Sequence, residues 1–330
     1  MDNNIKVMLN NFNNNVFDLL NYIVFQENNK YMLDSKLVLS DFNESCNSYT
    51  ENGIIYLKKS LLSNVDFSND IKKYNNIYYL IKNIYHELTH LRQIYDAEHG
   101  NASDDSLFYI VTYLINEYGD KDYYLRNYNF QFIEISAEEY AYNSVLNLLI
   151  GDSLLKNDIN DVINKINLRK KIIYRIDDMG NEISIFDYFP SILKSIIKNN
   201  LNLLDEFPLL LNFFNSNGSL KKIDKCSINI YDKCPVFFKY LYFYEILDIK
   251  FSNDIYLKIF ESFISDYITS FEYLLNHRLI GVKEIDFSIQ YYEKNAKIVL
   301  DKINIILDND NDLYDKFILY KNKLLSLMER

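Results

Sequence analysis

Two histidines four residues apart form the most distinctive chemical pattern of this sequence. They lie in the segment YHELTH at residues 85–90, which contains the pattern His-Glu-x-x-His. On a helix, residues four apart project from the same face, about one turn from each other. Neutral imidazole nitrogens suit Zn²⁺, and a catalytic zinc with two of them needs a third protein ligand and an open position for water. The segment therefore predicts that His86 and His90 bind zinc.

Glu87 stands directly after the first histidine, so we expect its carboxylate near the open position of the ion. A carboxylate there can take a proton from water as the water attacks a carbonyl carbon, and can pass it to the leaving nitrogen. Glu87 is therefore the predicted general base of a hydrolase. The alternative is a surface helix whose histidines are only solvated.

Apolar residues predict a long helix over about residues 70–99 that contains this motif. The steps between the apolar positions are 4, 3, 4, 3 and 4 residues, a pattern typical of a helix buried along one side. These positions are Ile77, Ile81, Ile84, Leu88, Leu91 and Tyr95. Because each histidine follows a core position by two residues, it lies about 200° around the helix from it. We therefore expect the histidines to face a cleft opposite the core.

One candidate for the third ligand lies further along the same helix. In a longer form of the motif, a Gly three residues after the second His breaks the helix, and a ligand follows three residues later. Gln93 occupies the Gly position here and Asp96 the ligand position. Gln93 supplies no helix break, so Asp96 is kept as an alternative ligand only.

A second predicted helix, over about residues 132–150, offers better candidates. Glu134 and Glu138 share one of its faces with Ala137 and Ala141. Small side chains let two helices approach closely, and a carboxylate must come within about 2 Å of zinc to bind it. On this reasoning either glutamate can be the third ligand. The alternative is an ordinary acidic helix start, which the helix dipole favours.

The two motifs together resemble the gluzincin metallopeptidases, in which a Glu-x-x-Ala-Asp/Glu pattern on a second helix supplies the third ligand. Their spacing is similar to that in the catalytic domain of the anthrax lethal factor group. Their place in the chain resembles that in the phage-repressor-cleaving metallopeptidases of low-GC bacteria. The resemblance covers roughly residues 35–150. It implies that Glu134 binds zinc and that Glu138 orients a histidine or water.

The same resemblance implies two further parts of the site. A tyrosine shortly before the third ligand stabilises the oxyanion in such enzymes; Tyr128 is the nearest here, and Tyr124 the next. The strand Gly53–Lys58 is expected to be an edge strand, along which an extended peptide pairs through its backbone.

Around these residues the sequence predicts a mainly helical protein of the α+β kind. It contains only 7 Gly and 3 Pro, and its long Leu- and Ile-rich periodic stretches favour helices. Short strands are expected at residues 36–39 and 53–58, and a hairpin within 171–186. With the resemblance, this predicts a zincin-like metallopeptidase domain with a small sheet over residues 1–152. Residues 153–330 are expected to be mostly helical and to select substrate or dock a partner.

The composition limits the classes of protein to which the chain can belong. Its 330 residues carry 35 basic and 46 acidic side chains, which gives a net charge of −11. Sequence-independent binding of nucleic acid requires a basic surface, so we expect no nucleic-acid partner. Asn, Ile, Lys, Tyr and Phe are abundant, and their AT-rich codons indicate a low-GC bacterial genome.

The three cysteines indicate neither a thiolate metal site nor a disulfide scaffold. They are Cys46, Cys226 and Cys234, and no Cys-x-x-Cys pair occurs among them. We expect them to be small buried side chains, with a disulfide between Cys226 and Cys234 as the alternative.

The expected location follows from two absent patterns. No basic region followed by an apolar run begins the sequence, so we expect no Sec signal. No stretch of about 18 uninterrupted apolar residues occurs, so we expect no membrane span. The prediction is a cytoplasmic protein, with non-classical export as a toxin or effector as the alternative.

These observations predict a zinc-dependent endopeptidase that hydrolyses a peptide bond in a protein or peptide substrate. The alternative is a regulatory or binding module on a zincin scaffold, with a structural metal or none. An intact Glu87 favours the enzyme, because a structural metal site has no need of a general base.

Overall fold

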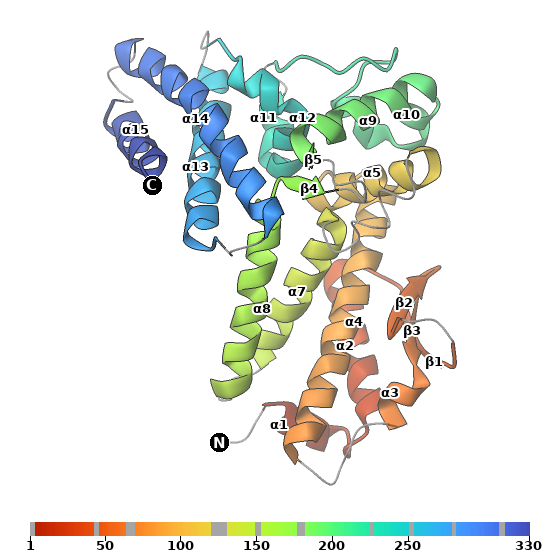
Figure 1. Cartoon of the computed structure of the whole chain (residues 1–330). Coiled ribbons are helices and arrows are strands. Elements are labelled where there is room, and N and C mark those ends of the chain that lie inside the picture. The colour runs from red at the N-terminus through yellow and green to blue at the C-terminus, as the bar shows by residue number, and fades with distance from the viewer. Residues whose placement is uncertain are drawn as a thin grey trace. The chain divides into compact units, whose positions relative to one another are not determined.

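The computed structural model describes most of the chain, and the described part is mainly helical with two small sheets (Figure 1). The described residues are 4–42, 46–63, 70–119, 131–148, 153–176, 182–224, 227–250, 254–278, 282–309 and 314–330. The prediction of a mainly helical protein with a small sheet is confirmed.

The chain folds into two compact units that alternate along the sequence. The N-terminal unit comprises Met1–His99 and Asn129–Asn167, and the C-terminal unit comprises Gly100–Tyr128 and Leu168–Arg330. The boundaries between the two units therefore differ from the boundary at residue 152 that the motifs suggested. As a division of function, that boundary stays a prediction.

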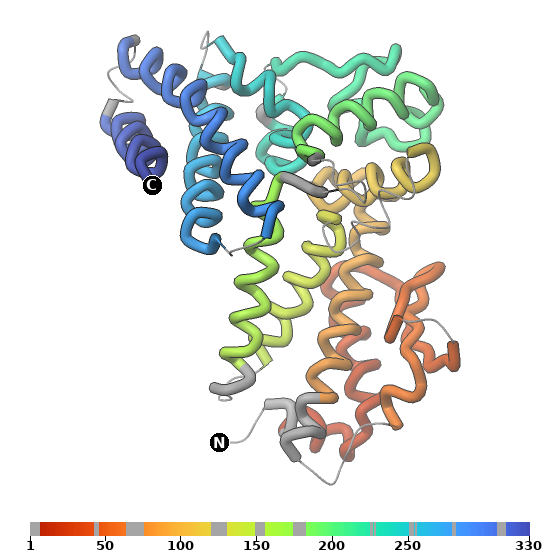
Figure 2. Tube along the Cα trace, viewed as in Figure 1, coloured from red at the N-terminus to blue at the C-terminus, as the bar shows by residue number. Residues whose placement is uncertain are grey.

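The longest helix of the N-terminal unit carries the histidine motif. The helices of this unit are α1 (Asn4–Asn11), α2 (Val16–Tyr31), α3 (Lys59–Ser63), α4 (Asp70–Glu98), α7 (Phe132–Leu148) and the first part of α8 (Ser153–Lys171). α4 packs against both α2 and α7, so segments far apart in the sequence lie side by side (Figure 2). The helix predicted over 70–99 is confirmed. Gly100 follows it with a φ of +71°, the left-handed backbone that favours glycine after a helix.

The sheet of this unit has three strands, in the order β1-β3-β2. They are β1 (Lys36–Ser40), β2 (Ser48–Glu51) and β3 (Ile54–Lys58), and β3 pairs parallel to β1 and antiparallel to β2. The expectation that Gly53–Lys58 is an edge strand is therefore wrong, because β3 lies in the middle. The third strand was missed within residues 41–52, a segment that reads as a polar turn. Asn52 and Gly53 have φ of +51° and +77° and form the tight turn between β2 and β3, and Asn-Gly is a strong hairpin signal.

The apolar stripe of α4 lies in the core of the N-terminal unit. Its most deeply buried members are Ile77, Ile81, Ile84 and Leu88. They belong to one buried cluster with Ile55 and Leu57 of β3. Burying a side chain of this size stabilises the fold by about 1.5–3 kcal/mol. The stripe therefore sets the rotation of α4 about its axis, and with it the direction in which the histidines project.

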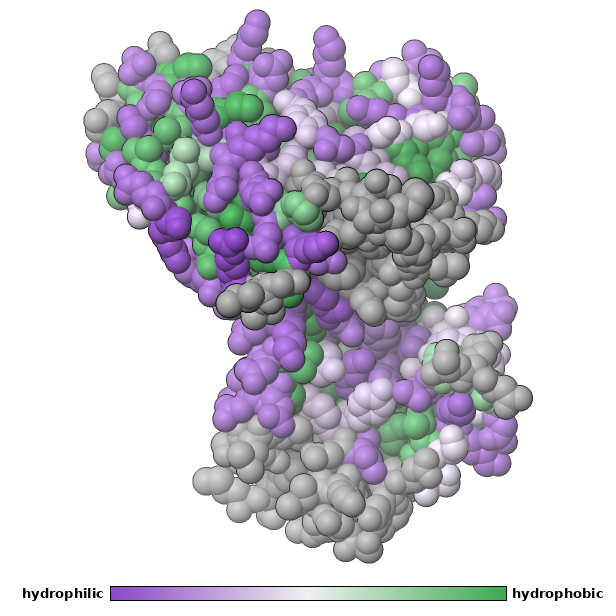
Figure 3. Space-filling view, in the orientation of Figure 1, coloured by the Kyte–Doolittle hydropathy of each residue, from purple (hydrophilic) through white to green (hydrophobic). Residues whose placement is uncertain are grey.

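α8 lies within residues 153–330, which were expected to be mostly helical, but no separate helix was predicted at its own residues. Its sequence is mostly polar, and hydrophilic side chains predominate on the face of this helix seen in Figure 3. From residue 156 to the end of α8, where burial is described, only a narrow apolar stripe is deeply buried, with Ile159 and Ile166 as its members. Such a narrow stripe gives a weak periodic signal, which explains why the helix was missed.

The C-terminal unit consists of helices and one short hairpin. Its helices are α5 (Asp104–Tyr118), α9 (Ile185–Asn199), α10 (Leu203–Glu206), the 3₁₀ helix η2 (Pro208–Asn212), α11 (Ser227–Lys233), α12 (Pro235–Leu247), α13 (Asp254–Asn276), α14 (Lys283–Asn309) and α15 (Tyr314–Met328). Strands β4 (Tyr174–Ile176) and β5 (Glu182–Ser184) pair antiparallel where the sequence predicts a hairpin. Most aromatic residues of α12 belong to the core of this unit: Phe237, Phe238 and Phe243 are almost completely buried, whereas Tyr244 is exposed.

A partly buried carboxylate joins two helices of the C-terminal unit. Asp104, at the start of α5, accepts hydrogen bonds from the backbone N–H groups of Val236 at 3.3 Å and Phe237 at 2.7 Å, in the first turn of α12. These N–H groups have no partner within their own helix. Burial raises the pKa of Asp104 to about 6, although the two backbone hydrogen bonds act in the opposite direction.

Two expectations about the chain as a whole can be compared with the described residues. Neither Cys46 nor Cys234 takes part in a disulfide, and Cys226 lies outside the described residues. Among the described helices, none combines the length and apolar character that crossing a bilayer requires.

Candidate metal centre

Two histidines of α4 and one glutamate of α7 converge in the N-terminal unit. His86 and His90 lie one turn apart on α4, and Glu134 lies in the first turn of α7, which packs along α4. The Nε2 atoms of the two histidines are 3.1 Å apart. Nε2 of His86 is 3.4 Å from Oε2 of Glu134, and Nε2 of His90 is 3.4 Å from Oε1. Within the described part of the chain, only these three side chains form a convergent group that could hold a metal ion.

These separations match the spacing that a tetrahedral zinc ion imposes on its ligands. With metal–ligand bonds of about 2.0–2.1 Å and tetrahedral angles, two ligand atoms lie about 3.3 Å apart. The separation of 3.1 Å between the two Nε2 atoms, and that of 3.4 Å from each Nε2 to its nearer carboxylate oxygen, Oε2 for His86 and Oε1 for His90, lie on either side of that value. Two imidazoles with one carboxylate are also a ligand set that leaves a fourth position open in catalytic zinc sites. The residues present therefore fit a zinc ion.

Glu134 is a buried carboxylate whose charge is stabilised by the two imidazoles. Its exposed fraction is 7%. Burial raises the pKa of Glu134, but the hydrogen bonds and charges of His86 and His90 outweigh it and hold this pKa well below its usual range. Glu134 is therefore ionised at neutral pH, as a metal ligand must be.

His90 has partners at both ring nitrogens. Its Nε2 faces the cluster, and its Nδ1 is 2.9 Å from Oε1 of Gln93. Burial lowers the pKa of His90, but the hydrogen bond to Glu134, the charges of Glu134 and Glu87 and the bond to Gln93 together raise it above its usual value. A proton and a metal ion would compete for the same nitrogen, so the affinity of this candidate site for a metal ion would fall on acidification.

Glu87 is held by a hydrogen bond from the sheet. Its exposed fraction is 6%, and its Oε1 accepts a hydrogen bond of 2.9 Å from Oγ of Ser48, the first residue of β2. The charge of Glu87 contributes to the raised pKa of His90, so the carboxylate lies within electrostatic range of this ligand. A carboxylate in this position can accept a proton from water beside the ligands.

Close packing and a polar contact hold α7 in place. Ala137 and Ala141 are fully buried, which agrees with the expected close approach of the two helices. The hydroxyl of Tyr140 donates a hydrogen bond of 2.7 Å to Oε2 of Glu27 on α2, and also accepts one of 3.0 Å from Nζ of Lys30. These contacts fix the rotation of α7 that turns Glu134 toward α4.

The other predicted site residues are not part of the cluster. Asp96 lies on α4, which continues without a break to Glu98, and it does not join the convergent group. Glu138, one turn along α7, does not join it either. Tyr128 and Tyr124 lie outside the described residues, so an oxyanion role for either stays a prediction.

Two side chains with contacts in this site were not predicted as parts of it. Ser48 lies on the strand that was missed, and the Asn-Gly pair at 52–53 was the signal for that strand. Gln93 was considered only as a position where the helix could break. Its place three residues after His90, on a neighbouring part of the same helix face, was the available signal.

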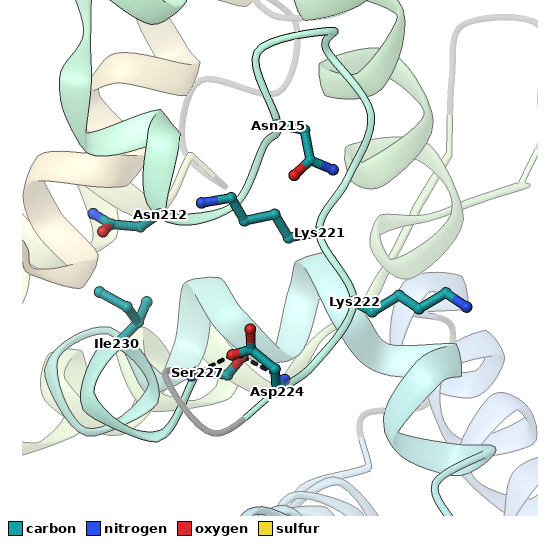
Figure 4. Close-up of a pocket in the computed structure, with 7 residues that line it drawn as sticks. All are labelled: Asn212, Asn215, Lys221, Lys222, Asp224, Ser227 and Ile230. Carbon is teal, nitrogen blue, oxygen red and sulfur yellow. Dashed lines mark hydrogen bonds between the residues drawn. The ribbon is translucent and has the colours of Figure 1, made fainter.

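A cavity in the C-terminal unit shows no comparable chemistry (Figure 4). Its volume is about 420 Å³, and its lining residues are Asn212, Asn215, Lys221, Lys222, Asp224, Ser227 and Ile230. Asp224 accepts hydrogen bonds from the backbone N–H and the hydroxyl of Ser227, and Nζ of Lys221 donates to the carbonyl oxygen of Leu211. Of the lining residues, Asp224 and Ser227 bond to each other, and the labelled polar side chains do not point toward a common position (Figure 4).

Comparison of the chain with protein-family models, curated proteins and solved structures finds no match in any of the three.

Proposed function

We propose that this protein is a zinc-dependent endopeptidase of the gluzincin type, with its metal centre in the N-terminal unit. The observation that carries the proposal is the convergence of His86, His90 and Glu134: the two Nε2 atoms lie 3.1 Å apart, and each lies 3.4 Å from one of the two carboxylate oxygens of Glu134. A further glutamate, buried beside the ligands, is what a hydrolytic site needs and a structural one does not. The zincin-like character of this unit is part of the same proposal.

The chain's own residues have separate roles in this reaction. His86, His90 and Glu134 would hold the ion, which when bound supplies Lewis acidity toward a water molecule and a peptide carbonyl. Glu87 accepts the proton of the attacking water and returns it to the leaving nitrogen. Ser48 keeps the carboxylate of Glu87 oriented through its hydrogen bond.

The outer edge of β2, which pairs with no further strand in the described part of the chain, is the proposed binding surface for an extended peptide. β2 is an outer strand of the three-stranded sheet, and its first residue contacts Glu87. A peptide that pairs with this edge through its backbone would therefore pass beside the general base. This role moves from β3, which is paired on both sides, to β2.

Zinc content and peptide cleavage test the proposal in the full-length protein. The wild type should bind one zinc ion per chain and cleave members of a mixed peptide library, as detected by mass spectrometry. Glu87→Gln should keep the zinc and lose about 10²–10⁴-fold in hydrolysis, because the amide cannot accept the proton. His86→Ala should lose both.

The matched control is Glu98→Gln, which makes the same change at an exposed position of the same helix. It should retain zinc and activity. A wild type without zinc, or a Glu87→Gln variant as active as the wild type, would refute the proposal. Stoichiometric zinc with no cleavage of any peptide would instead indicate the binding or regulatory module.

A further inference from the structure

Gln93 is a fully buried amide that makes hydrogen bonds at both ends. Its Oε1 lies 2.9 Å from Nδ1 of His90, and its Nε2 donates a hydrogen bond of 3.2 Å to the carbonyl oxygen of Ile133. Ile133 directly precedes Glu134 in the chain. One side chain thus joins one metal ligand of α4 to the backbone beside the metal ligand of α7.

The chemistry of these contacts determines where the proton of His90 lies. The carbonyl oxygen of Ile133 can only accept, so it faces the NH₂ group of Gln93 and the amide oxygen faces His90. An amide oxygen can also only accept, so Nδ1 of His90 must carry the proton. In the neutral ring, Nε2 then has a lone pair directed at the cluster, which is the form that binds a metal ion.

We infer that Gln93 is a positioning residue of the metal centre, which selects the metal-binding tautomer of His90 and links it to the start of α7. This inference deepens the proposed function and rests on its metal site. Without an acceptor at Nδ1, the proton can move to Nε2 and be donated to Glu134, whose Oε1 is 3.4 Å away. That hydrogen bond would occupy both ligand atoms and oppose metal binding.

The other histidine gives this role more weight. Nδ1 of His86 is buried and has no hydrogen-bond partner among the described residues. Ligand histidines usually donate their second ring N–H to an acceptor, and loss of that acceptor typically lowers metal affinity 10–100-fold. In the described part of the chain, only His90 has such an acceptor, so the orientation of the pair depends on Gln93.

Three variants of the full-length protein separate the two contacts of Gln93. Gln93→Leu removes both hydrogen bonds and puts an apolar side chain of similar volume in place of the amide. Gln93→Glu keeps an acceptor for Nδ1 of His90 but loses the donor to Ile133. Thr89→Val is the matched control, because Thr89 is equally buried on the same helix and its hydroxyl bonds only to a backbone carbonyl of α4.

The first measurement is the tautomer of His90 in the metal-free protein, from ¹⁵N–¹H correlation of the imidazole nitrogens. Because the pKa of His90 lies above its ordinary value, spectra are recorded over a series of rising pH values, and the tautomer is read where the ¹⁵N shifts show a neutral ring. In the wild type, in Thr89→Val and in Gln93→Glu, the proton should lie on Nδ1. In Gln93→Leu it should lie mainly on Nε2.

The second measurement is the zinc dissociation constant, from competition with a chelator. It should rise about 10–100-fold in Gln93→Leu, rise less in Gln93→Glu, and change less than twofold in Thr89→Val. Far-UV circular dichroism checks that each variant is folded. The tautomer of His90 in the wild type tests the inference even if a variant fails to fold.

Several outcomes would overturn the inference, and they differ from those that refute the proposed reaction. A proton on Nε2 of His90 in the metal-free wild type overturns it, as does unchanged zinc affinity in Gln93→Leu. A wild type that binds no zinc overturns both the inference and the proposed function. Zinc binding without peptide cleavage overturns the endopeptidase alone, because both measurements on Gln93 stand without activity.

Discussion

Each unit of the protein contains a shielded carboxylate in the first turn of a helix, and the two carboxylates have opposite properties. Glu134 in the N-terminal unit has a pKa well below its usual range, because the hydrogen bonds and charges of the two imidazoles outweigh the effect of burial. Asp104 in the C-terminal unit has a pKa raised to about 6, because burial outweighs its two backbone hydrogen bonds.

The difference lies in what surrounds each carboxylate. The partners of Asp104 are backbone N–H groups of α12, which donate hydrogen bonds and cannot exchange them for a metal ion. The partners of Glu134 are imidazole nitrogens, which can release a proton and bind a metal ion in its place. A shielded carboxylate whose partners are all backbone N–H groups therefore has a structural role. One whose partners are side chains that can also bind a metal ion is a candidate metal ligand.

The largest expected effect is on zinc affinity. Glu134→Gln should raise the zinc dissociation constant by at least about 100-fold. Loss of a residue that only hydrogen-bonds to a metal ligand already lowers metal affinity about 10–100-fold. Asp104→Asn, the same change in the other unit, should leave it unchanged. Chelator competition measures both. Equal zinc affinities in the two variants would remove the distinction between the carboxylates.

Zinc should also stabilise the two units unequally. At a free zinc concentration 100 times the dissociation constant, binding adds about 2.7 kcal/mol to the stability of the state that binds it. Hydrogen exchange should therefore slow in α4 and α7 and stay unchanged in α5 and α12. Glu134→Gln should abolish the slowing. Equal protection of all four helices would contradict the assignment of the metal to one unit.

The structural role of Asp104 predicts a loss of stability of intermediate size. Asp104→Ala leaves two N–H donors of α12 without their acceptor and should reduce the free energy of unfolding by about 1–3 kcal/mol. Urea unfolding measures this loss. Asp105→Ala removes an acidic charge from the same turn, and its cost should stay within about 1 kcal/mol. Loss of zinc binding in Asp104→Ala would show that Asp104 affects metal binding and not only the stability of the fold.

The smallest expected effect is an opposite dependence on pH. The raised pKa of Asp104 means that the folded protein holds this proton after the unfolded chain has lost it, so its contribution falls as the pH rises from about 4 to 6. Urea unfolding should show the stability of the wild type falling relative to Asp104→Asn over this range. A constant difference would indicate that the pKa of Asp104 is not raised.

The lowered pKa of Glu134 gives the reverse sign. Its contribution is present above the ordinary value of 4.5 and is lost as the pH falls further. The metal-free wild type should therefore lose stability relative to Glu134→Gln on acidification below about 4.5.

The parts of this site that depend on one helix could be predicted from the sequence. The i, i+4 spacing places His86 and His90 on one face of α4, and the apolar stripe identifies the opposite face as buried. Glu134 could not be identified from the helix pattern alone, because helix geometry allowed either Glu134 or Glu138 as the third ligand. The resemblance to a known family favoured Glu134. The structure brings Glu134 to the histidines and leaves Glu138 and Asp96 out of the group.

Contacts between distant elements could not be predicted. Ser48 reaches Glu87 only because a hairpin places β2 beside α4, and nothing in the periodicity of either segment specifies that packing. The bond between Gln93 and Ile133 likewise depends on how α4 and α7 cross. α8 was missed because its buried stripe is narrow. Its contacts with distant segments determine which residues are buried, and the local apolar pattern does not specify those contacts.

The alternation of the two units has a consequence for dissecting the protein genetically. A chain that stops after residue 152 lacks Ile159, a member of the buried cluster of the N-terminal unit. A chain that stops after residue 167 keeps that cluster, but it carries residues 100–128 without the remainder of their unit. No single stop codon therefore isolates the unit with the candidate metal centre, and a separation of the two units requires an internal deletion of residues 100–128 bridged by a linker.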